Sequence, residues 1–213
     1  MGKTIHFRLA VGALIWFAAL AHAGLAQADP VRTGQAQAGG TITEVVETYR
    51  IRGKTGAELY ASIGENGPQL GPRRAIAHTR FKLTWRRDYQ RRETDCVLAS
   101  AVPRLVIITT LPKPAGSLPP DVAKSWDRFI TGIRAHEAVH GTYVRTLLAE
   151  IETATIGLTQ PNDPGCTVIK TEMTKRLGAI SDARKTKDRA FDQAEMSEGG
   201  TVHQLVLALV NGP

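Results

Sequence analysis

Cysteine is scarce in the sequence, which contains only Cys96 and Cys166. Neither belongs to a CxxC pair, and this fact disfavours a zinc site built from thiolates. The chain also lacks GxSxG or a similar motif around a serine or cysteine nucleophile, so nothing indicates a hydrolase of those classes. If the chain is exported, both cysteines enter an oxidising compartment, where we expect them to form a structural disulfide.

Long apolar runs are missing as well. The run over residues 9–21 is shorter than the roughly 20 residues that a membrane-spanning helix needs. A basic stretch without acidic residues precedes it, and the small-residue patterns AHA and AQA follow it. These features predict a secretory signal peptide over residues 1–28, cleaved after Ala28 or, as the alternative, after Ala23. We therefore expect a periplasmic or secreted protein with no stable membrane span after cleavage.

Removal of 28 of the 213 residues leaves 185, enough for one domain and one catalytic centre. The formal charge falls from +7 to +5 because two basic residues are lost with the signal peptide. No RNP, KH or zinc-finger pattern accompanies this charge, so we interpret it as a solvated face and expect no nucleic-acid partner. Residues 29–42 lack apolar periodicity and are expected to be a flexible mature N-terminus. Residues 43–213 are expected to form the single domain.

Three segments have the composition of strands. Residues 45–51 alternate apolar and polar side chains, residues 78–89 carry apolar side chains at every second position, and residues 96–110 contain the β-branched run LVIITT. A short helix is expected after Thr55, which is a suitable N-cap. The last two strands are joined by the charged turn RRETD and are expected to pair.

Two long helices follow the strands. The first opens at Pro119 and Pro120 and ends near Gly157, and the second runs from about Cys166 to Ala194. The fold class is therefore α+β, with a small antiparallel sheet packed on a long two-helix hairpin. In the first helix, side chains recur at steps of three and four along one buried stripe. This stripe comprises Val122, Trp126, Phe129, Ile133, His136, His140, Val144, Leu147 and Ile151.

The stripe contains the motif HEAVH, which predicts a zinc site. His136 and His140 are four residues apart on a helix and can direct their imidazole nitrogens at one point. In a site with three protein ligands, zinc keeps an open position for water and lowers the pKa of that water toward ~7. Glu137 is placed to accept the proton of that water and later to protonate the leaving amine. The alternative interpretation is a chance motif whose histidines are ordinary core residues.

The third protein ligand is not fixed by the motif. The metzincin continuation after His140 is absent, and acidic residues further along the same helix lie beyond side-chain reach. An antiparallel hairpin that turns near Asn162 brings the middle and end of the second helix opposite the histidines. The candidates on this segment are Asp188, Asp192, Glu195 and Glu198, with His203 a further residue that can approach.

Five segments occur in an order that is more specific than any one of them. They are YRIRGKTGAELYASIGENGP, HTRFKLTWRRDY, CVLASAVPRLVIITTLP, WDRFITGIRAHEAVH and FDQAE. In this order they resemble the bacterial secreted family called domain of unknown function 922, whose predicted activity is that of a zinc-dependent protease. The family pattern continues with an aromatic-Asp pair and Thr-x-His-Gly, whereas here Glu198 and Gly199 follow Phe191 and Asp192. The resemblance thus leaves Asp192 or Glu198 as the third ligand, or an impaired site.

Together these features predict an exported zinc-dependent metallohydrolase of the HExxH metalloprotease type, with Zn²⁺ as cofactor and Glu137 as general base. Its expected partner is a peptide or protein substrate, with a peptide-bearing polymer of the cell envelope as one candidate. The alternative function is a non-catalytic envelope protein that binds a partner or has a structural role, with a degenerate or structural metal site. A closed site with four protein ligands would distinguish that alternative.

Overall fold

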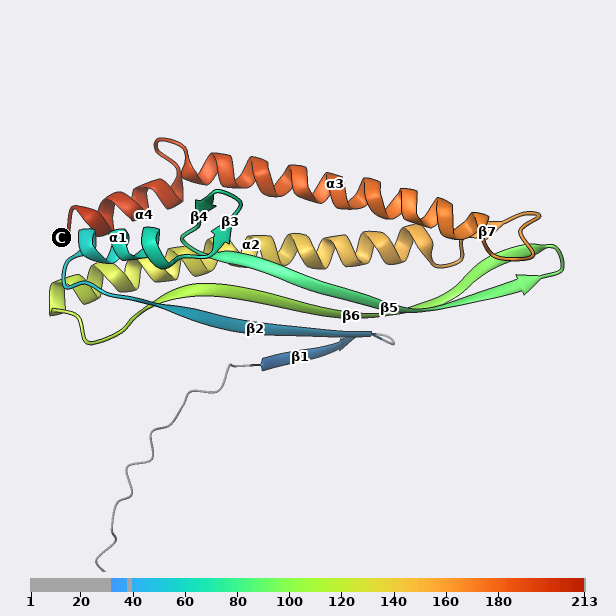
Figure 1. The fold of residues 1–213 in the computed structure, drawn as a ribbon, viewed down its shortest axis with the longest axis horizontal. Helices are drawn as coiled ribbons and strands as arrows, with labels where there is room; N and C mark the ends of the chain where they lie inside the picture. The colour runs from blue at the N-terminus through green and yellow to red at the C-terminus, as the bar shows by residue number, and fades with distance from the viewer. Residues whose placement is uncertain (1–31, 38–39, 213) are drawn as a thin grey trace, which may run out of the picture.

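A computed structural model describes residues 32–37 and 40–212. The expected signal peptide, residues 1–28, lies outside the described residues. Within the described residues, the fold consists of four helices, a mixed sheet and a small two-stranded sheet (Figure 1), which confirms the α+β class. In chain order the elements are β1 (Arg32–Gln37), β2 (Gly40–Ile51), α1 (Gly56–Asn66), β3 (Gln69–Leu70), β4 (Arg73–Arg74), β5 (His78–Arg92), β6 (Asp95–Pro114), α2 (Pro120–Thr155), β7 (Thr159–Gln160), α3 (Val168–Met196) and α4 (Thr201–Val210).

The main sheet has the strand order β1-β2-β6-β5, and β7 adds to the start of β6. The expectation of a wholly antiparallel sheet needs correction, because β2 and β6 pair in parallel. The reason is that β6 inserts between β2 and β5. Since β5 and β6 form an antiparallel hairpin and β5 runs opposite to β2, the inserted strand shares the direction of β2.

The N-terminal side of the domain also departs from expectation. Residues 40–42, assigned to the flexible N-terminus, begin β2, and residues 32–37 form β1, which pairs antiparallel with β2. Ile42 is buried against Leu105 and Ile107 of β6, which explains why the strand starts earlier than its clearest alternation. The domain therefore begins before residue 43.

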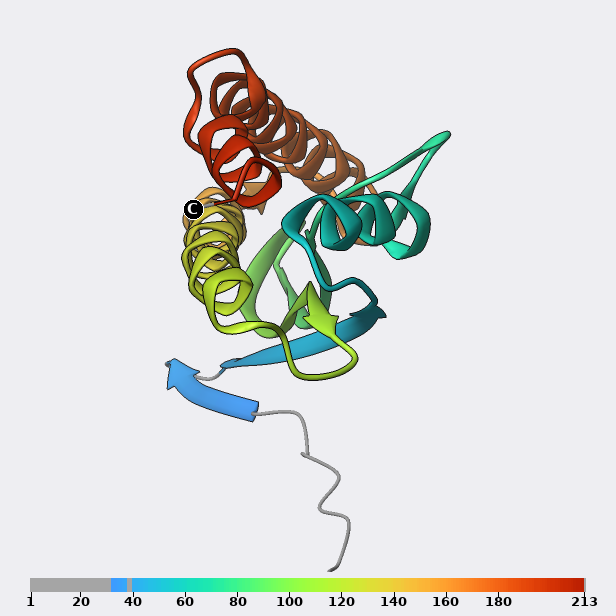
Figure 2. The same cartoon turned by 90° about the vertical axis from the view of Figure 1, so that its left-hand side faces the viewer.

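The helices form a second layer on the sheet, as Figure 2 shows from one end. α2 is the central element, because it packs against the sheet, α3 and α4. Its apolar stripe buries Phe129 and Ile133 beside α1 and α4, and Val144 and Leu148 beside β2 and β6. α1 begins with a capping box in which Thr55 and Glu58 exchange hydrogen bonds. No helix of the described residues combines the length and apolar character that crossing a bilayer requires.

The Cys96–Cys166 disulfide is present, as expected. It joins the start of β6 to Cys166, two residues before α3, and both cysteines belong to a cluster with Leu98, Ile169 and Met173. The bond therefore fixes the end of the helical hairpin to the sheet.

Replacing both cysteines with serine is expected to lower the free energy of unfolding by about 4 kcal/mol, because a closed loop spanning 70 residues is lost from the unfolded ensemble. The melting temperature falls by about 10 °C for a domain of this size. Thermal unfolding of the double variant measures the change, with the reduced parent protein as a matched control. Equal melting temperatures for parent and variant would contradict the expectation.

Candidate metal centre

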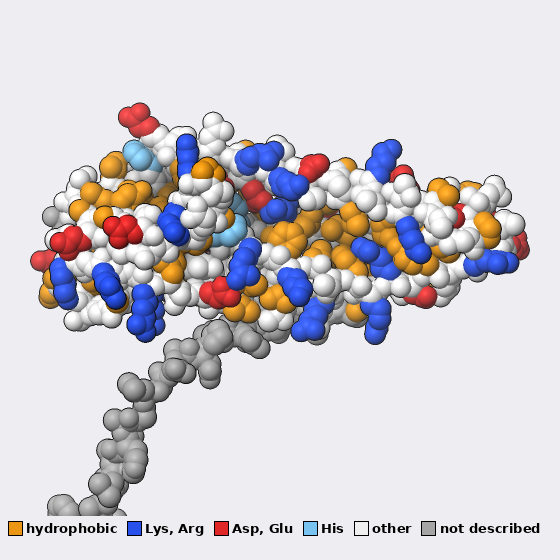
Figure 3. All heavy atoms as spheres, in the orientation of Figure 1, with side chains coloured by type: hydrophobic (Ala, Val, Ile, Leu, Met, Phe, Trp, Pro, Cys, Tyr) orange, Lys and Arg blue, Asp and Glu red, His pale blue; other side chains and the backbone are white. Residues whose placement is uncertain are grey.

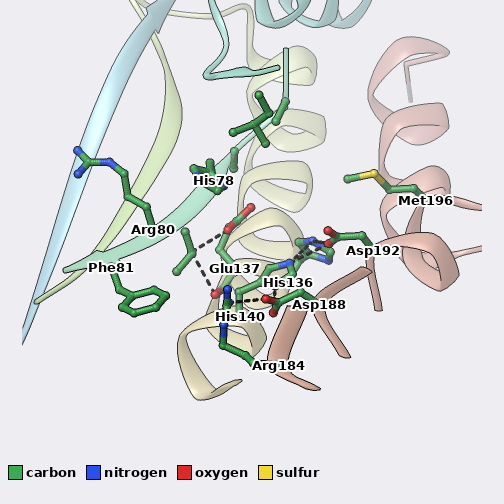
Figure 4. Close-up of a pocket in the computed structure, with 14 residues that line it drawn as sticks. His78, Arg80, Phe81, His136, Glu137, His140, Arg184, Asp188, Asp192 and Met196 are labelled. Carbon is green, nitrogen blue, oxygen red and sulfur yellow. Dashed lines mark hydrogen bonds and ion pairs between the residues drawn. The ribbon is translucent and has the colours of Figure 1, made fainter. Parts of the chain in front are cut away.

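The two histidines of HEAVH lie on the side of α2 that faces α3. α3 runs antiparallel to α2 along most of its length (Figure 1), as the hairpin prediction required. His136 is 6% exposed, and Glu137 is 5% exposed. Figure 4 shows both histidines pointing toward side chains of α3, whereas Glu137 points toward β5. The local spacing therefore separates the residues that can bind a metal from the residue that can move a proton.

Three ligand atoms converge between the two helices. His136 Nε2 lies 3.2 Å from His140 Nε2. The same oxygen of Asp192, Oδ1, lies 2.8 Å from His140 Nε2 and 3.3 Å from His136 Nε2. These three residues form a group that could hold a metal ion. Two imidazole nitrogens and a carboxylate oxygen suit a divalent transition metal such as zinc.

Further acidic residues of α3 surround the ligand atoms. Asp188 Oδ1 lies 3.1 Å from His140 Nδ1, and the other oxygen of Asp188 pairs with Arg184. Glu195 Oε2 lies 3.8 Å from His136 Nδ1. Asp188, Asp192 and Glu195 are spaced by four and three residues, so one face of α3 supplies all three. Carboxylates in this outer position orient metal-binding histidines and raise their basicity.

The surroundings of the histidines fit a cation better than they fit ordinary core histidines. His136 Nδ1 is buried and has no hydrogen-bond partner among the described residues. His140 is held by carboxylates at both ring nitrogens. Burial lowers the pKa of His140, but hydrogen bonds to Asp192 and Asp188 outweigh burial and raise the pKa to about 9. Burial opposes ionisation of Asp192, but hydrogen bonds from His136 and His140 lower its pKa well below the usual range. The centre thus favours positive charge.

This charge preference predicts how the stability of the metal-free protein depends on pH. The pKa of His140 is 6.5 in the unfolded chain and about 9 in the fold, so its protonated form stabilises the fold. The contribution is at most about 3 kcal/mol below pH 6.5, and it disappears as the pH rises through about 9. Denaturant unfolding of the metal-free protein across this window measures it. The variant His140→Gln should lack this dependence, and a parent stability that stays level or increases would refute the expectation.

Glu137 is positioned by the neighbouring strand. Thr79 of β5 donates a hydrogen bond of 2.7 Å to Glu137 Oε2, and its hydroxyl lies 3.2 Å from the hydroxyl of Thr109 on β6. Glu137 is not a member of the ligand group. Its second carboxylate oxygen therefore remains available for a proton.

Glu137 and the ligand group line one cleft of about 380 Å³. Figure 4 shows that β5, α2 and α3 each contribute a wall. His78, at the start of β5, faces the cleft, and burial lowers its pKa, so its ring is neutral at pH 7. A neutral ring can donate a hydrogen bond to a ligand in the cleft. The other contributors include Thr79, Arg80, Phe81, Arg184, Asp188 and Met196.

The structure brings together most of the residues that the sequence singled out. His136, His140 and Asp192 form the group, and Asp188 and Glu195 stand beside it. Glu198 does not join the group, because α3 ends at Met196 and the chain turns toward α4 with Glu198 exposed. His203 accepts a hydrogen bond from the backbone N–H of Gly199 instead.

Sequence reasoning missed the contribution of β5. The segment HTRF begins that strand, and its residues were expected to belong to the sheet, with no role in the site. Its period-two pattern indicated which side chains share a face, but gave no signal that Thr79 would reach Glu137. Arg184, which holds Asp188, was also missed, since a charged residue on a long polar helix is usually solvated.

Comparison with known proteins identifies the family of the chain. No curated protein and no solved structure matches the chain. A family model described as "Bacterial protein of unknown function (DUF922)" matches residues 46–200. The matched region runs from β2 to the turn before α4, so it includes the motif and the acidic face of α3. Since this match spans well over half of the sequence, the chain belongs to the bacterial family DUF922.

Proposed function

We propose that this protein is an exported metallopeptidase that uses zinc. The observation that carries the proposal is the separation of roles in the cleft. Two histidines and Asp192 converge on one point, while the neighbouring Glu137 is buried, hydrogen-bonded through one oxygen only and outside the ligand group. A site that only braced the two helices would not need a second, free carboxylate beside its ligands.

Each residue of the cleft has a separate role in the proposed reaction. His136, His140 and Asp192 would hold the metal, which supplies Lewis-acid polarisation of a carbonyl and acidifies water. Asp188 fixes the ring of His140 so that Nε2 faces Asp192. Glu137 takes a proton from the attacking water on its free oxygen and passes it to the leaving nitrogen. Thr79 holds the carboxylate of Glu137 in place during both transfers.

The disulfide supports an extracytoplasmic location. Structural disulfides form and persist in oxidising compartments such as the bacterial periplasm. Cys96 is fully buried in the cluster at the start of β6, so this bond belongs to the folded structure. We therefore place the proposed peptidase in the periplasm or outside the cell, where its substrate is a peptide or protein.

The test is a cleavage assay with the mature chain, residues 29–213, and unfolded casein as substrate. The proposal expects fragments when the protein is loaded with zinc, none after treatment with a chelator, and restored cleavage when zinc is returned. Elemental analysis of the same samples should give about one zinc per chain. Stoichiometric zinc without cleavage of casein or of a peptide library would favour the non-catalytic envelope protein instead.

A further inference from the structure

β5 is an edge strand that borders the cleft. It lies at the end of the order β1-β2-β6-β5, and within the described part of the chain it pairs only with β6. Its outer edge therefore presents unpaired backbone N–H and C=O groups. At 15 residues it is long for an edge strand. Such an edge can receive another extended chain by main-chain hydrogen bonding.

The inner face of β5 is apolar and open in part. Phe81, Leu83 and Trp85 point toward α2 and are only half-buried. Figure 3 shows a band of hydrophobic side chains between α3 and β5, with Lys and Arg on both of its borders. Arg184 lies over the ring of Phe81 and Arg87 over that of Trp85, at 5.2 and 5.4 Å. The band thus combines an apolar floor with cations.

The outer face of β5 carries exposed basic residues at the intervening positions. Arg80, Lys82 and Arg86 all lie on this face. Arg80 pairs with Glu47 of β2, whereas Lys82 and Arg86 have no ion-pair partner among the described residues. The two faces therefore differ in chemistry between Arg80 and Arg86, where the inner face is apolar and the outer face is mainly basic.

The side chains of a strand added to β5 would lie beside these two faces in turn. Side chains of an added strand also alternate between the two faces, and directly opposed pairs interact most strongly. Residues on the inner side would lie beside Phe81, Leu83 and Trp85, which favours apolar side chains. Residues on the outer side would lie beside Lys82 and Arg86, which favours acidic side chains.

We propose that the free edge of β5 binds an extended polypeptide that alternates apolar and acidic residues, and that this segment is the preferred substrate of the cleft. The proposal rests on the peptidase function proposed above. The first residues of β5, His78 to Phe81, line the cleft together with Glu137 and His140. A strand paired with them would carry its backbone past Glu137. A second copy of this chain is a poorer occupant, because two β5 edges would bring like charges together.

Binding can be measured apart from cleavage by using the mature chain with Glu137→Gln. The probe is a labelled synthetic peptide that alternates leucine and glutamate, followed by fluorescence anisotropy. Three comparison peptides separate the causes: one with the same residues in two blocks, one with lysine in place of glutamate, and one N-methylated at every second backbone nitrogen. We expect the alternating peptide to bind more tightly than each of them by about tenfold or more.

The double variant Lys82→Glu and Arg86→Glu should weaken binding of the leucine–glutamate peptide by about tenfold and strengthen binding of the leucine–lysine peptide. The reason is that the charge on the outer face of β5 changes sign. Arg128 is an exposed residue of α2 outside the cleft, so Arg128→Glu is the matched control and should leave the affinities for both peptides unchanged. Equal binding of the N-methylated or block peptide, insensitivity to the double variant, or no binding at all overturns the proposal. If the alternating peptide binds but the zinc-loaded parent does not cleave it, the peptidase function is wrong and binding at the edge of β5 stands. If the parent cleaves peptides without this preference, binding at the edge of β5 is wrong and the peptidase function stands.

Discussion

The variant Glu137→Gln is expected to cleave casein about 10²- to 10⁴-fold more slowly than the parent while binding the same amount of zinc. Glutamine keeps the size of the side chain and can still accept the hydrogen bond from Thr79, but it cannot take up a proton. The ligand group consists of His136, His140 and Asp192, so the substitution leaves it intact. Initial rates and elemental analysis on one preparation measure both quantities.

The matched control for this experiment is Glu150→Gln. It makes the same change on the same helix at a position that is outside the cleft. Its cleavage rate should stay within about twofold of the parent, since surface substitutions of this kind usually change stability by less than ~0.5 kcal/mol. Parent-like cleavage by Glu137→Gln would remove the general base from the proposed mechanism. Loss of zinc from Glu137→Gln would instead place this carboxylate among the ligands.

The second large effect is expected for Asp192→Ala. This change removes one of three ligand atoms, so the affinity for zinc should fall by more than the roughly 10- to 100-fold that is typical when an outer-shell partner is lost. Asp192 is 44% exposed at its side chain, so truncation to alanine leaves no cavity in the core. Competition with a chromophoric zinc chelator gives the dissociation constant.

Glu198→Ala provides the comparison, because the family pattern made this residue the rival third ligand. It is exposed beyond the end of α3, and its removal should leave zinc affinity unchanged. If Glu198→Ala released zinc and Asp192→Ala retained it, the turn after α3 would have to close over the centre when the metal binds. That result would reverse the assignment of the third ligand.

The sequence predicted the parts of the fold that depend on local periodicity. The apolar stripe of α2 located both histidines on its inward side, and the short connection to α3 required an antiparallel partner. Counting back from the turn then placed Asp188 and Asp192 near the motif, and the structure agrees. Helix geometry alone sufficed here, because both elements are long and regular.

Features that depend on long-range pairing could not be predicted in this way. The insertion of β6 between β2 and β5 changes no local pattern, so periodicity suggested a wholly antiparallel sheet. For the same reason, no local pattern predicted that the start of β5 lies beside α2, and the contact between Thr79 and Glu137 was missed. A strand pattern indicates which side chains share a face, but which element packs against that face depends on the strand order of the whole sheet.

α3 has an unusual distribution of buried residues. In this helix of 29 residues only Ile169 and Met173 are buried, and both lie next to the Cys96–Cys166 disulfide. About 30 Å further along, the contacts to α2 come from the acids that face His136 and His140 and from Phe191, whose ring stacks on that of His136. The disulfide therefore anchors the start of α3 to the sheet, and the candidate metal centre, which favours a cation, anchors its end to α2. In a reducing environment the first of these anchors is lost, and without a metal the second rests on the hydrogen bonds that His140 makes with Asp188 and Asp192.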